Sequence, residues 1–153
     1  MDPNQQQLLL TGGAKDSTYI DDVFSTYVYT GTSNAGRAVN NGIDLAGEGG
    51  LTWIKARGHS TTTGGGVENH ALFDTSRGVT KGISSNTNGA EVTDASSLTS
   101  FNSNGFSLGT GYGNFATNLN NYTYSSWNFR KAPGFFDVVT YTGNGSNRTI
   151  AHS

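Results

Sequence analysis

Cysteine is absent from the 153 residues of this chain. Its absence excludes a disulfide framework and any metal site built on thiolates. Charge is also scarce, because charged residues make up 13% of the sequence and the formal net charge is −2 at pH 7. A general nucleic-acid binder presents a basic face, so this composition predicts no nucleic-acid partner.

Long apolar runs are missing as well. No stretch approaches the roughly 18 apolar residues that a membrane-spanning helix needs, so we expect no insertion into a membrane. The run Leu8–Leu10 is too short for the core of a signal peptide and has no basic segment before it. We therefore expect synthesis in the cytoplasm without ordinary secretion.

Small polar residues and aromatic residues are abundant in the sequence instead. Glycine occurs 22 times, and aromatic residues reach 11% of the sequence. Disordered chains combine high charge with few aromatics, so this is not their composition. Many short strands joined by tight turns have this composition instead.

One phrase occurs twice in the chain. Residues 24–31 read Phe-Ser-Thr-Tyr-Val-Tyr-Thr-Gly, and residues 136–143 read Phe-Asp-Val-Val-Thr-Tyr-Thr-Gly. Each copy continues into a polar turn and then a basic residue, which is Arg37 in the first copy and Arg148 in the second. An internal repeat of this kind predicts that one β unit ends near residue 132 and that a second one begins, cut short at Ser153.

Strand patterns follow one another along the chain. The clearest is Leu51–Lys55, where Leu51, Trp53 and Lys55 alternate with Thr52 and Ile54. The pairs Asn41-Gly42 and Asn104-Gly105 are turn residues typical of hairpins. Further strands are expected at 23–29, 37–39, 71–73, 82–84, 98–101, 105–108 and 122–130.

No helical period lasts for more than about two turns, so the predicted fold is all-β. The most favoured form is an antiparallel β-sandwich. We expect an extended N-terminal arm at residues 1–17, the sandwich at 18–132 and the start of the second β unit at 133–153. The arm either becomes ordered against a partner or is a frayed terminus.

Four blocks of sequence resemble a family of proteins from marine phages: Asp22–Tyr27, Asn41–Lys55, Leu72–Gly78 and Ser126–Asp137. These are cyanophage-type, tail-fibre-like virion structural proteins, often with a concanavalin-like or laminin-G-like jelly roll. The resemblance covers about residues 18–153. It implies a virion component made in the host cytoplasm and located at the tail.

The resemblance also implies partners. The arm is where such a fibre docks onto adaptor-type or nozzle-type tail proteins, and fibres of this kind are usually homotrimers. The candidate residues for anchoring and assembly are Gln5, Gln6, Gln7, Leu8, Leu9 and Leu10.

Chemistry by paired carboxylates or by a metal ion has little support. The acidic pairs are Asp21 with Asp22, Asp44 with Glu48, Glu68 with Asp74, and Glu91 with Asp94. All lie in turn-like sequence, so structural roles are favoured over acid–base catalysis. Calcium at Asp44 and Glu48 is a minor alternative, and His59 and His70 lack a third ligand at a supporting spacing. We predict no catalytic residue, no metal and no cofactor.

Asp74 and Arg77 suit a strand end followed by a turn, in which the aspartate accepts N–H groups of the turn. An architectural role is therefore favoured for this pair.

A host-surface glycan is a further candidate partner. Tyr112, Phe115 and Tyr122 lie in or beside an Asn-rich and Gly-rich loop, where rings could stack on sugar faces while amides bond the hydroxyls. Packing of these rings into the sandwich is the alternative, and it is favoured.

Taken together, these observations favour a non-enzymatic virion structural protein, the N-terminal part of a tail fibre that anchors the fibre to the tail. The alternative is a lectin-like module that acts in host recognition or decorates a capsid. A glycan depolymerase has little support, because the Glu-x-Asp-x-Glu strand pattern of jelly-roll glucanases is missing.

Overall fold

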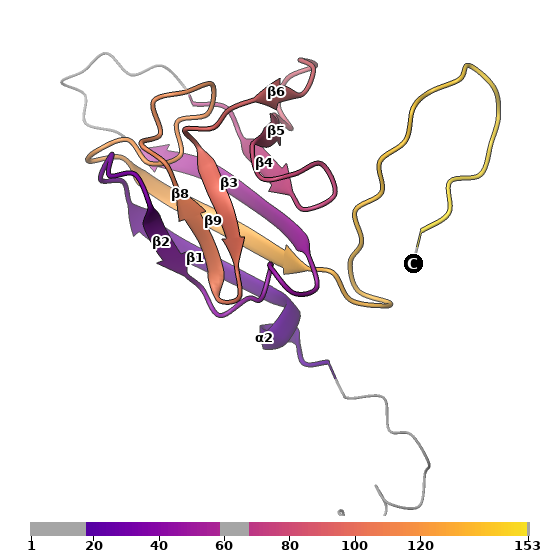
Figure 1. The fold of residues 1–153 in the computed structure, drawn as a ribbon, viewed down its shortest axis with the longest axis horizontal. Helices are drawn as coiled ribbons and strands as arrows, with labels where there is room; N and C mark the ends of the chain where they lie inside the picture. Colours follow the sequence, from indigo (N-terminus) through magenta and orange to yellow (C-terminus); the bar gives the residue numbers. More distant parts are fainter. Residues whose placement is uncertain (1–17, 59–67, 153) are drawn as a thin grey trace, which may run out of the picture.

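Two antiparallel sheets face each other in the structure, a computed structural model that describes residues 18–58 and 68–152 (Figure 1). The larger sheet has the strand order β1-β9-β3-β4-β5-β6, and the smaller has the order β2-β8-β7. The predicted all-β, antiparallel sandwich is confirmed, and the described part of the chain adds a single helical turn, α2. The elements are α2 (Ile20–Val23), β1 (Phe24–Thr30), β2 (Arg37–Asn40), β3 (Gly50–Gly58), β4 (Ala71–Asp74), β5 (Lys81–Ile83), β6 (Val92–Thr93), β7 (Leu98–Asn102), β8 (Gly105–Leu108) and β9 (Thr123–Arg130).

Alternation of side chains gives each long strand a buried and a partly exposed face. In β3, Thr52 and Ile54 are buried, whereas Trp53 and its same-face neighbours are only partly buried. Strand β9 pairs with both β1 and β3, so it is an inner strand of the large sheet. The alternation predicted for β3 is therefore confirmed, and the structure shows that the face with Thr52 and Ile54 is the buried one.

The core fills the space between the two sheets. Tyr29 of β1 stacks on Tyr124 of β9 with ring centroids 4.9 Å apart, and the Tyr29 hydroxyl donates to the Thr117 carbonyl at 2.8 Å. Burial is the main reason that the pKa of Tyr29 lies well above its ordinary value. The buried cluster comprises Tyr29, Val39, Ile54, Ala71, Phe73, Leu98, Phe106, Leu108, Phe115, Tyr122 and Tyr124.

The two predicted hairpin turns have different outcomes. At the predicted Asn104-Gly105 hairpin, Ser103 and Asn104 form the turn, and Gly105 begins β8, which pairs with β7 in antiparallel fashion. Gly105 has φ +126°, and a Cβ there would lie 2.1 Å from the Val39 carbonyl oxygen, so this position requires glycine. Asn41-Gly42 also forms a turn, with φ +88° at Gly42, but the strands on either side of it belong to different sheets.

The second copy of the repeated phrase forms no strand within residues 137–152, whereas the first copy is β1. Its start is tied to the sandwich through an isolated antiparallel bridge between Ala132 and Phe136. In Figure 1 this C-terminal segment leaves the end of β9 and runs on the side of β4 and β5. A second β unit from residue 133 stays a prediction, and the arm at 1–17 lies outside the described residues.

No helix among the residues that the structure describes has the length and apolar character needed to cross a bilayer.

Candidate functional site

The outer face of the large sheet, which points away from the small sheet, is the broadest candidate surface. Strand alternation and register place on it Phe24, Thr26 and Val28 of β1, Ser125, Trp127 and Phe129 of β9, Leu51, Trp53 and Lys55 of β3, and Leu72 of β4. Most of these side chains are half-buried, and Val28 is 61% exposed. The outer face is therefore rich in aromatic and aliphatic groups.

Two tryptophans form the middle of the outer face. The rings of Trp53 and Trp127 lie 5.6 Å apart at an interplanar angle of 57°. The Trp53 indole N–H donates to His70 Nδ1 at 2.7 Å. Burial, with a smaller effect of the Lys55 charge, lowers the pKa of His70, which keeps this nitrogen unprotonated and able to accept.

Three phenylalanines lie at one end of the outer face. Phe24 packs on Phe129 with centroids 4.9 Å apart, and Phe136 stacks on the same ring at 5.0 Å. An ion pair of 2.9 Å between Lys131 and Asp137 accompanies this stack. The C-terminal segment is thus attached to the sandwich at its first residues.

A groove of about 540 Å³ separates the next part of the C-terminal segment from the sheet. The Ser76 hydroxyl donates to the Val138 carbonyl at 3.1 Å, which holds the two sides together. The groove is lined by Ser76, Arg77, Ile83, Glu91, Val139, Thr140 and Tyr141.

The Arg77 guanidinium at this groove is already engaged. It pairs with Asp74 at 2.5 Å and lies 3.8 Å from Glu91. The Arg77 main-chain N–H also donates to Asp74 Oδ1 at 2.9 Å. The architectural role predicted for Asp74 and Arg77 is confirmed by this turn.

The same local arrangement of a tyrosine and an arginine occurs twice. Arg37 lies over the Tyr29 ring at 5.0 Å, and Arg148 lies over the Tyr141 ring at 5.0 Å. In each case the arginine also donates to the carbonyl of the residue after the tyrosine, Thr30 or Thr142. We call this arrangement the Tyr–Arg corner. The first corner begins in β1, whereas the second lies within residues 137–152, which form no strand.

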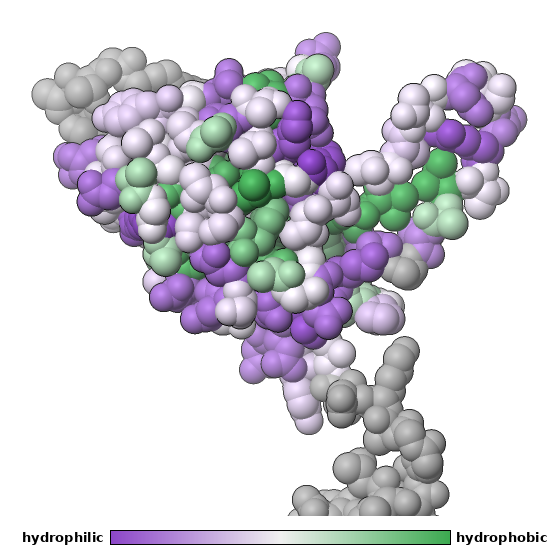
Figure 2. Space-filling view, in the orientation of Figure 1, coloured by the Kyte–Doolittle hydropathy of each residue, from purple (hydrophilic) through white to green (hydrophobic). Residues whose placement is uncertain are grey.

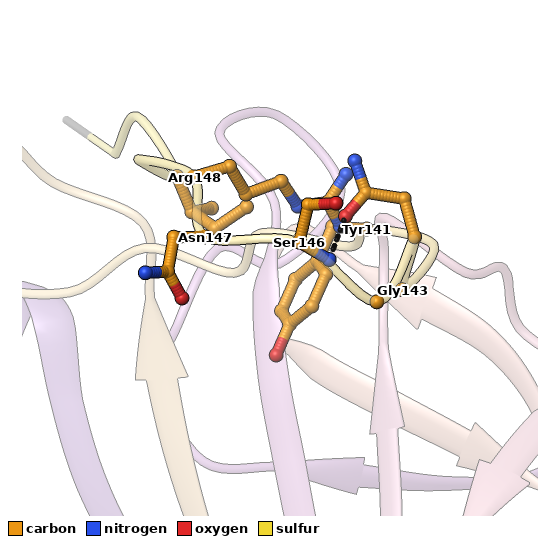
Figure 3. Close-up of a pocket in the computed structure, with 8 residues that line it drawn as sticks. Tyr141, Gly143, Ser146, Asn147 and Arg148 are labelled. Atoms are coloured by element: carbon orange, nitrogen blue, oxygen red, sulfur yellow. Dashed lines mark hydrogen bonds between the residues drawn. The ribbon is translucent and has the colours of Figure 1, made fainter.

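The second Tyr–Arg corner encloses a shallow pocket of about 550 Å³ (Figure 3). The dashed line in Figure 3 is the hydrogen bond from the Ser146 N–H to Asn144 Oδ1, 3.0 Å long. The pocket is lined by Tyr141, Gly143, Asn144, Gly145, Ser146, Asn147, Arg148 and Ile150. All of these belong to one exposed loop, so the pocket is open and is shaped by local turns.

The three predicted glycan-contact residues differ in their exposure to solvent. Tyr112 is 71% exposed, but Phe115 is 4% exposed and Tyr122 is 6% exposed. Phe115 packs edge-on against Phe73 at 5.3 Å, inside the core. A buried ring has no free face for a sugar, so Phe115 and Tyr122 are corrected to packing residues and Tyr112 alone keeps the geometry for contact.

The tip that carries Tyr112 is tied to the core by Asp94, a buried carboxylate. Its oxygens accept the Phe115 N–H at 3.0 Å and the hydroxyls of Ser96 and Ser97 at 2.8 Å each. Burial alone would raise the pKa of Asp94, but these hydrogen bonds outweigh it and the pKa is lowered. Asp94 therefore acts as a structural acceptor rather than as the partner of Glu91 in acid–base chemistry.

The remaining candidates from the sequence are local. Asp44 Oδ1 accepts the main-chain N–H groups of Ala46 and Gly47 at 3.1 and 2.9 Å, as a turn aspartate does. No cluster of three or more acidic, histidine or cysteine residues in the described ranges could hold a metal ion. His59 and the six candidate anchoring residues from Gln5 to Leu10 lie outside the described residues.

The tryptophan pair was not predicted from the sequence. The alternation of β3 and of β9 was recognised, but the pairing of Trp53 opposite Trp127 depends on the sheet order. A tryptophan at the centre of each of two alternating strands was the only available signal.

Comparison with known proteins gives one match. A family model described as "Domain of unknown function (DUF7483)" matches residues 19–153. No curated protein and no solved structure matches the chain.

Proposed function

For this chain, which belongs to the DUF7483 family, we propose a role as a non-enzymatic structural protein of a phage virion, the N-terminal part of a tail fibre. The observation that carries the proposal is the repeated Tyr–Arg corner, present at Tyr29–Arg37 inside the sandwich and at Tyr141–Arg148 beyond it. Repeat proteins, which are elongated, are built from similar units in series, each of which contacts its neighbours. A chain in which the first part of a β unit occurs twice is consistent with such an arrangement in series.

The sequence blocks that resemble marine phage fibres support the same proposal. Within these blocks, Asp74 and Arg77 form a turn, and Trp53 and Trp127 form a pair on the sheet. In this proposal the sandwich is a rigid shoulder, and residues 1–17 contact adaptor-type or nozzle-type tail proteins. The trimer expected from the resemblance belongs to the same proposal.

Deletion of residues 1–15 from the complete fibre protein tests the anchoring role. We expect the protein to disappear from purified virions, as measured by quantitative mass spectrometry, while the sandwich still folds. The matched control replaces the same residues by a Gly/Ser stretch of equal length, which keeps the spacing and removes the side chains. Normal incorporation of the deleted protein would overturn anchoring through this arm, and cryo-EM density on the capsid shell would make the protein a decoration protein.

A lectin-like module is the second candidate, and exposed aromatic groups favour it. Tyr112 is 71% exposed, and Trp53 and Trp127 present half-buried rings on the outer face. Stacking of a sugar on such a ring predicts binding on a glycan array that Tyr112→Ala or Trp127→Ala weakens. An array without signal would remove this candidate for the chain.

A further inference from the structure

Strand β1 forms an unprotected edge of the large sheet. It ends the strand order, and among the described strands it pairs with β9 alone. Its seven residues, Phe-Ser-Thr-Tyr-Val-Tyr-Thr, include no charge, proline or glycine. Edge strands in natural proteins are commonly protected by charge, proline, a bulge or shortness. The opposite edge, β6, has only two residues, so β1 is the edge that can accept another strand.

The free main-chain groups of β1 can be identified from the ladder. Residues of an antiparallel strand direct their N–H and C=O groups alternately toward and away from the partner strand. The Gly31 N–H donates to the Tyr122 carbonyl at 2.7 Å, which continues the β9 ladder at an odd-numbered position. Thr26 and Val28 therefore direct their N–H and C=O groups away from β9, and their side chains are exposed.

The ends of this edge are already satisfied. The Phe24 N–H donates to the Ile20 carbonyl, and the Thr30 carbonyl accepts from Arg37. The stretch from Thr26 to Val28 is what remains open for pairing.

The second occurrence of the phrase has a strand-forming sequence but is not part of a sheet in the structure. Residues 138–142 read Val-Val-Thr-Tyr-Thr, which are residue types enriched in strands. Val139 is 40% exposed and Tyr141 is 67% exposed, and Figure 2 shows apolar residues along this segment where it stands away from the sandwich. Its ends are held by Ser76 at Val138 and by Arg148 at Thr142, so the open stretch is 139–141.

Within one molecule, the open edge at Thr26–Val28 and the open stretch 139–141 lie on opposite sides. The C-terminal segment is fixed beside β4 through Ser76, and β9 and β3 separate β4 from β1 (Figure 1). While those contacts hold, residues 139–141 do not reach β1 of their own copy. The partner for residues 139–141 is therefore the β1 edge of a second molecule of this chain.

We propose that residues 139–141 of one copy pair as an added strand with Thr26–Val28 of a neighbouring copy. Main-chain hydrogen bonds to a sheet edge are an established mode of recognition between chains. The two surfaces differ, so the contact is heterologous and either closes into a ring or continues as a fibre. The proposal does not depend on the role in a virion.

Two proline variants of the 153-residue chain test the pairing. Val28→Pro removes an N–H that faces away from β9, so the β1–β9 ladder keeps its bonds and an edge strand tolerates the change. Val139→Pro removes the corresponding donor from the added strand, outside any strand of the single copy. The controls are Val28→Thr and Val139→Thr, and near-UV circular dichroism checks that every variant is folded.

Self-association is measured by sedimentation velocity over a wide range of concentrations. We expect the original chain and both threonine controls to associate, and each proline variant to associate about tenfold more weakly or not at all. A mixture of the two proline variants should form a one-to-one pair, because each keeps the surface that the other has lost.

Three results would overturn the proposal. The first is an original chain that stays monomeric throughout, and the second is association that neither proline affects. The third is loss with Val28→Pro alone and no recovery in the mixture, which would indicate symmetric pairing of two β1 edges. Recovery in the mixture supports the heterologous contact, because a symmetric one cannot produce it.

Discussion

At the scale of single residues, Asp94 shows how a carboxylate can serve a fold that has little charge. Its side chain is 4% exposed, and its oxygens accept two hydroxyls and two main-chain N–H groups. A carboxylate that accepts several hydrogen bonds is held in its charged form. Asp94 is one of the groups that attach the long loop carrying Tyr112, because the Phe115 N–H is among its donors.

Asp94→Asn is expected to destabilise the chain by about 1–3 kcal/mol, because the new amide group places donors against existing donors. The pKa of Asp94 is lowered in the folded protein from an ordinary value of 3.8. The stability that Asp94 contributes is therefore present above that ordinary value and is lost as the pH falls through the folded-state pKa.

Urea denaturation at a series of acidic pH values measures both effects. The variant should be less stable at neutral pH, and its stability should fall less on acidification than that of the original chain. Glu48→Gln, at an exposed position, is the control and should change neither quantity. An Asp94→Asn variant with unchanged stability would contradict the role described for this carboxylate.

Residue types alone could not separate Tyr112 from Phe115 and Tyr122. All three are aromatic and lie in or near one Asn-rich and Gly-rich loop. Phe115 is buried because its ring packs on Phe73 in the core, and its N–H donates to Asp94, a residue 21 positions earlier. Contacts over that distance depend on the fold, so the sequence supported a list of candidates but not their exposure.

At the scale of elements, the rings of Phe115 and Phe73 lie close against the main chain of β5 at Gly82. A Cβ at Gly82 would lie 2.3 Å from Phe115 Cε2 and 2.9 Å from Phe73 Cε1. Those two rings pack edge to face in the core at 5.3 Å. The middle residue of β5 must therefore be glycine for the phenylalanine pair to fit.

Gly82→Ala should destabilise the chain by about 1–3 kcal/mol through overpacking of the core. Gly89→Ala is the matched control, because its nearest neighbouring atom is Thr87 Oγ1 at 3.6 Å. Thermal unfolding followed by circular dichroism should show a lower midpoint for the first variant and almost no shift for the second. Equal midpoints for the two variants would refute the close approach.

Strand existence was easier to predict than strand partners. The alternation in β3 and β9 placed Thr52 and Ile54 on one face correctly, because side-chain direction is a local property of an extended chain. The two-residue strand β6 was missed, since two residues carry no period. Asn41-Gly42 was expected in a hairpin, but the chain crosses there from one sheet to the other.

At the scale of the whole molecule, the C-terminal segment is attached to the sandwich by few contacts. They include the bridge between Ala132 and Phe136, the stack of Phe136 on Phe129, the Lys131–Asp137 ion pair and the bond from Ser76. The core cluster includes no residue after Tyr124. The sandwich should therefore fold without this segment.

A chain that ends at Ala132 is expected to unfold cooperatively, with a loss of about 1–2 kcal/mol that comes mainly from the Phe136 ring. Phe136→Ala in the complete chain should reproduce most of that loss. Urea denaturation followed by tryptophan fluorescence measures both variants. Failure of the shortened chain to fold would show that the segment is an essential part of the sandwich.

Global sheet order could not be deduced from the sequence. The antiparallel layers were predicted from composition and turns, but the partner of the first strand is the last described one, with Phe24 opposite Phe129. The resemblance supplied the expectation of a jelly-roll-like sandwich, and the pairing of distant strands came only with the structure.

The position of β9 has a consequence for how the protein is made. Strand β9 is the last of the described strands to be synthesised. It lies between β1 and β3, which belong to the early part of the chain. Until residue 130 has emerged, the large sheet lacks one of its inner strands, and most contacts that close the sandwich span long stretches of sequence. Such topologies fold slowly and expose strand edges meanwhile. Until then, the nascent chain exposes the edges of β1 and β3 that later pair with β9. We therefore expect translation speed and chaperone access to govern the yield of folded protein.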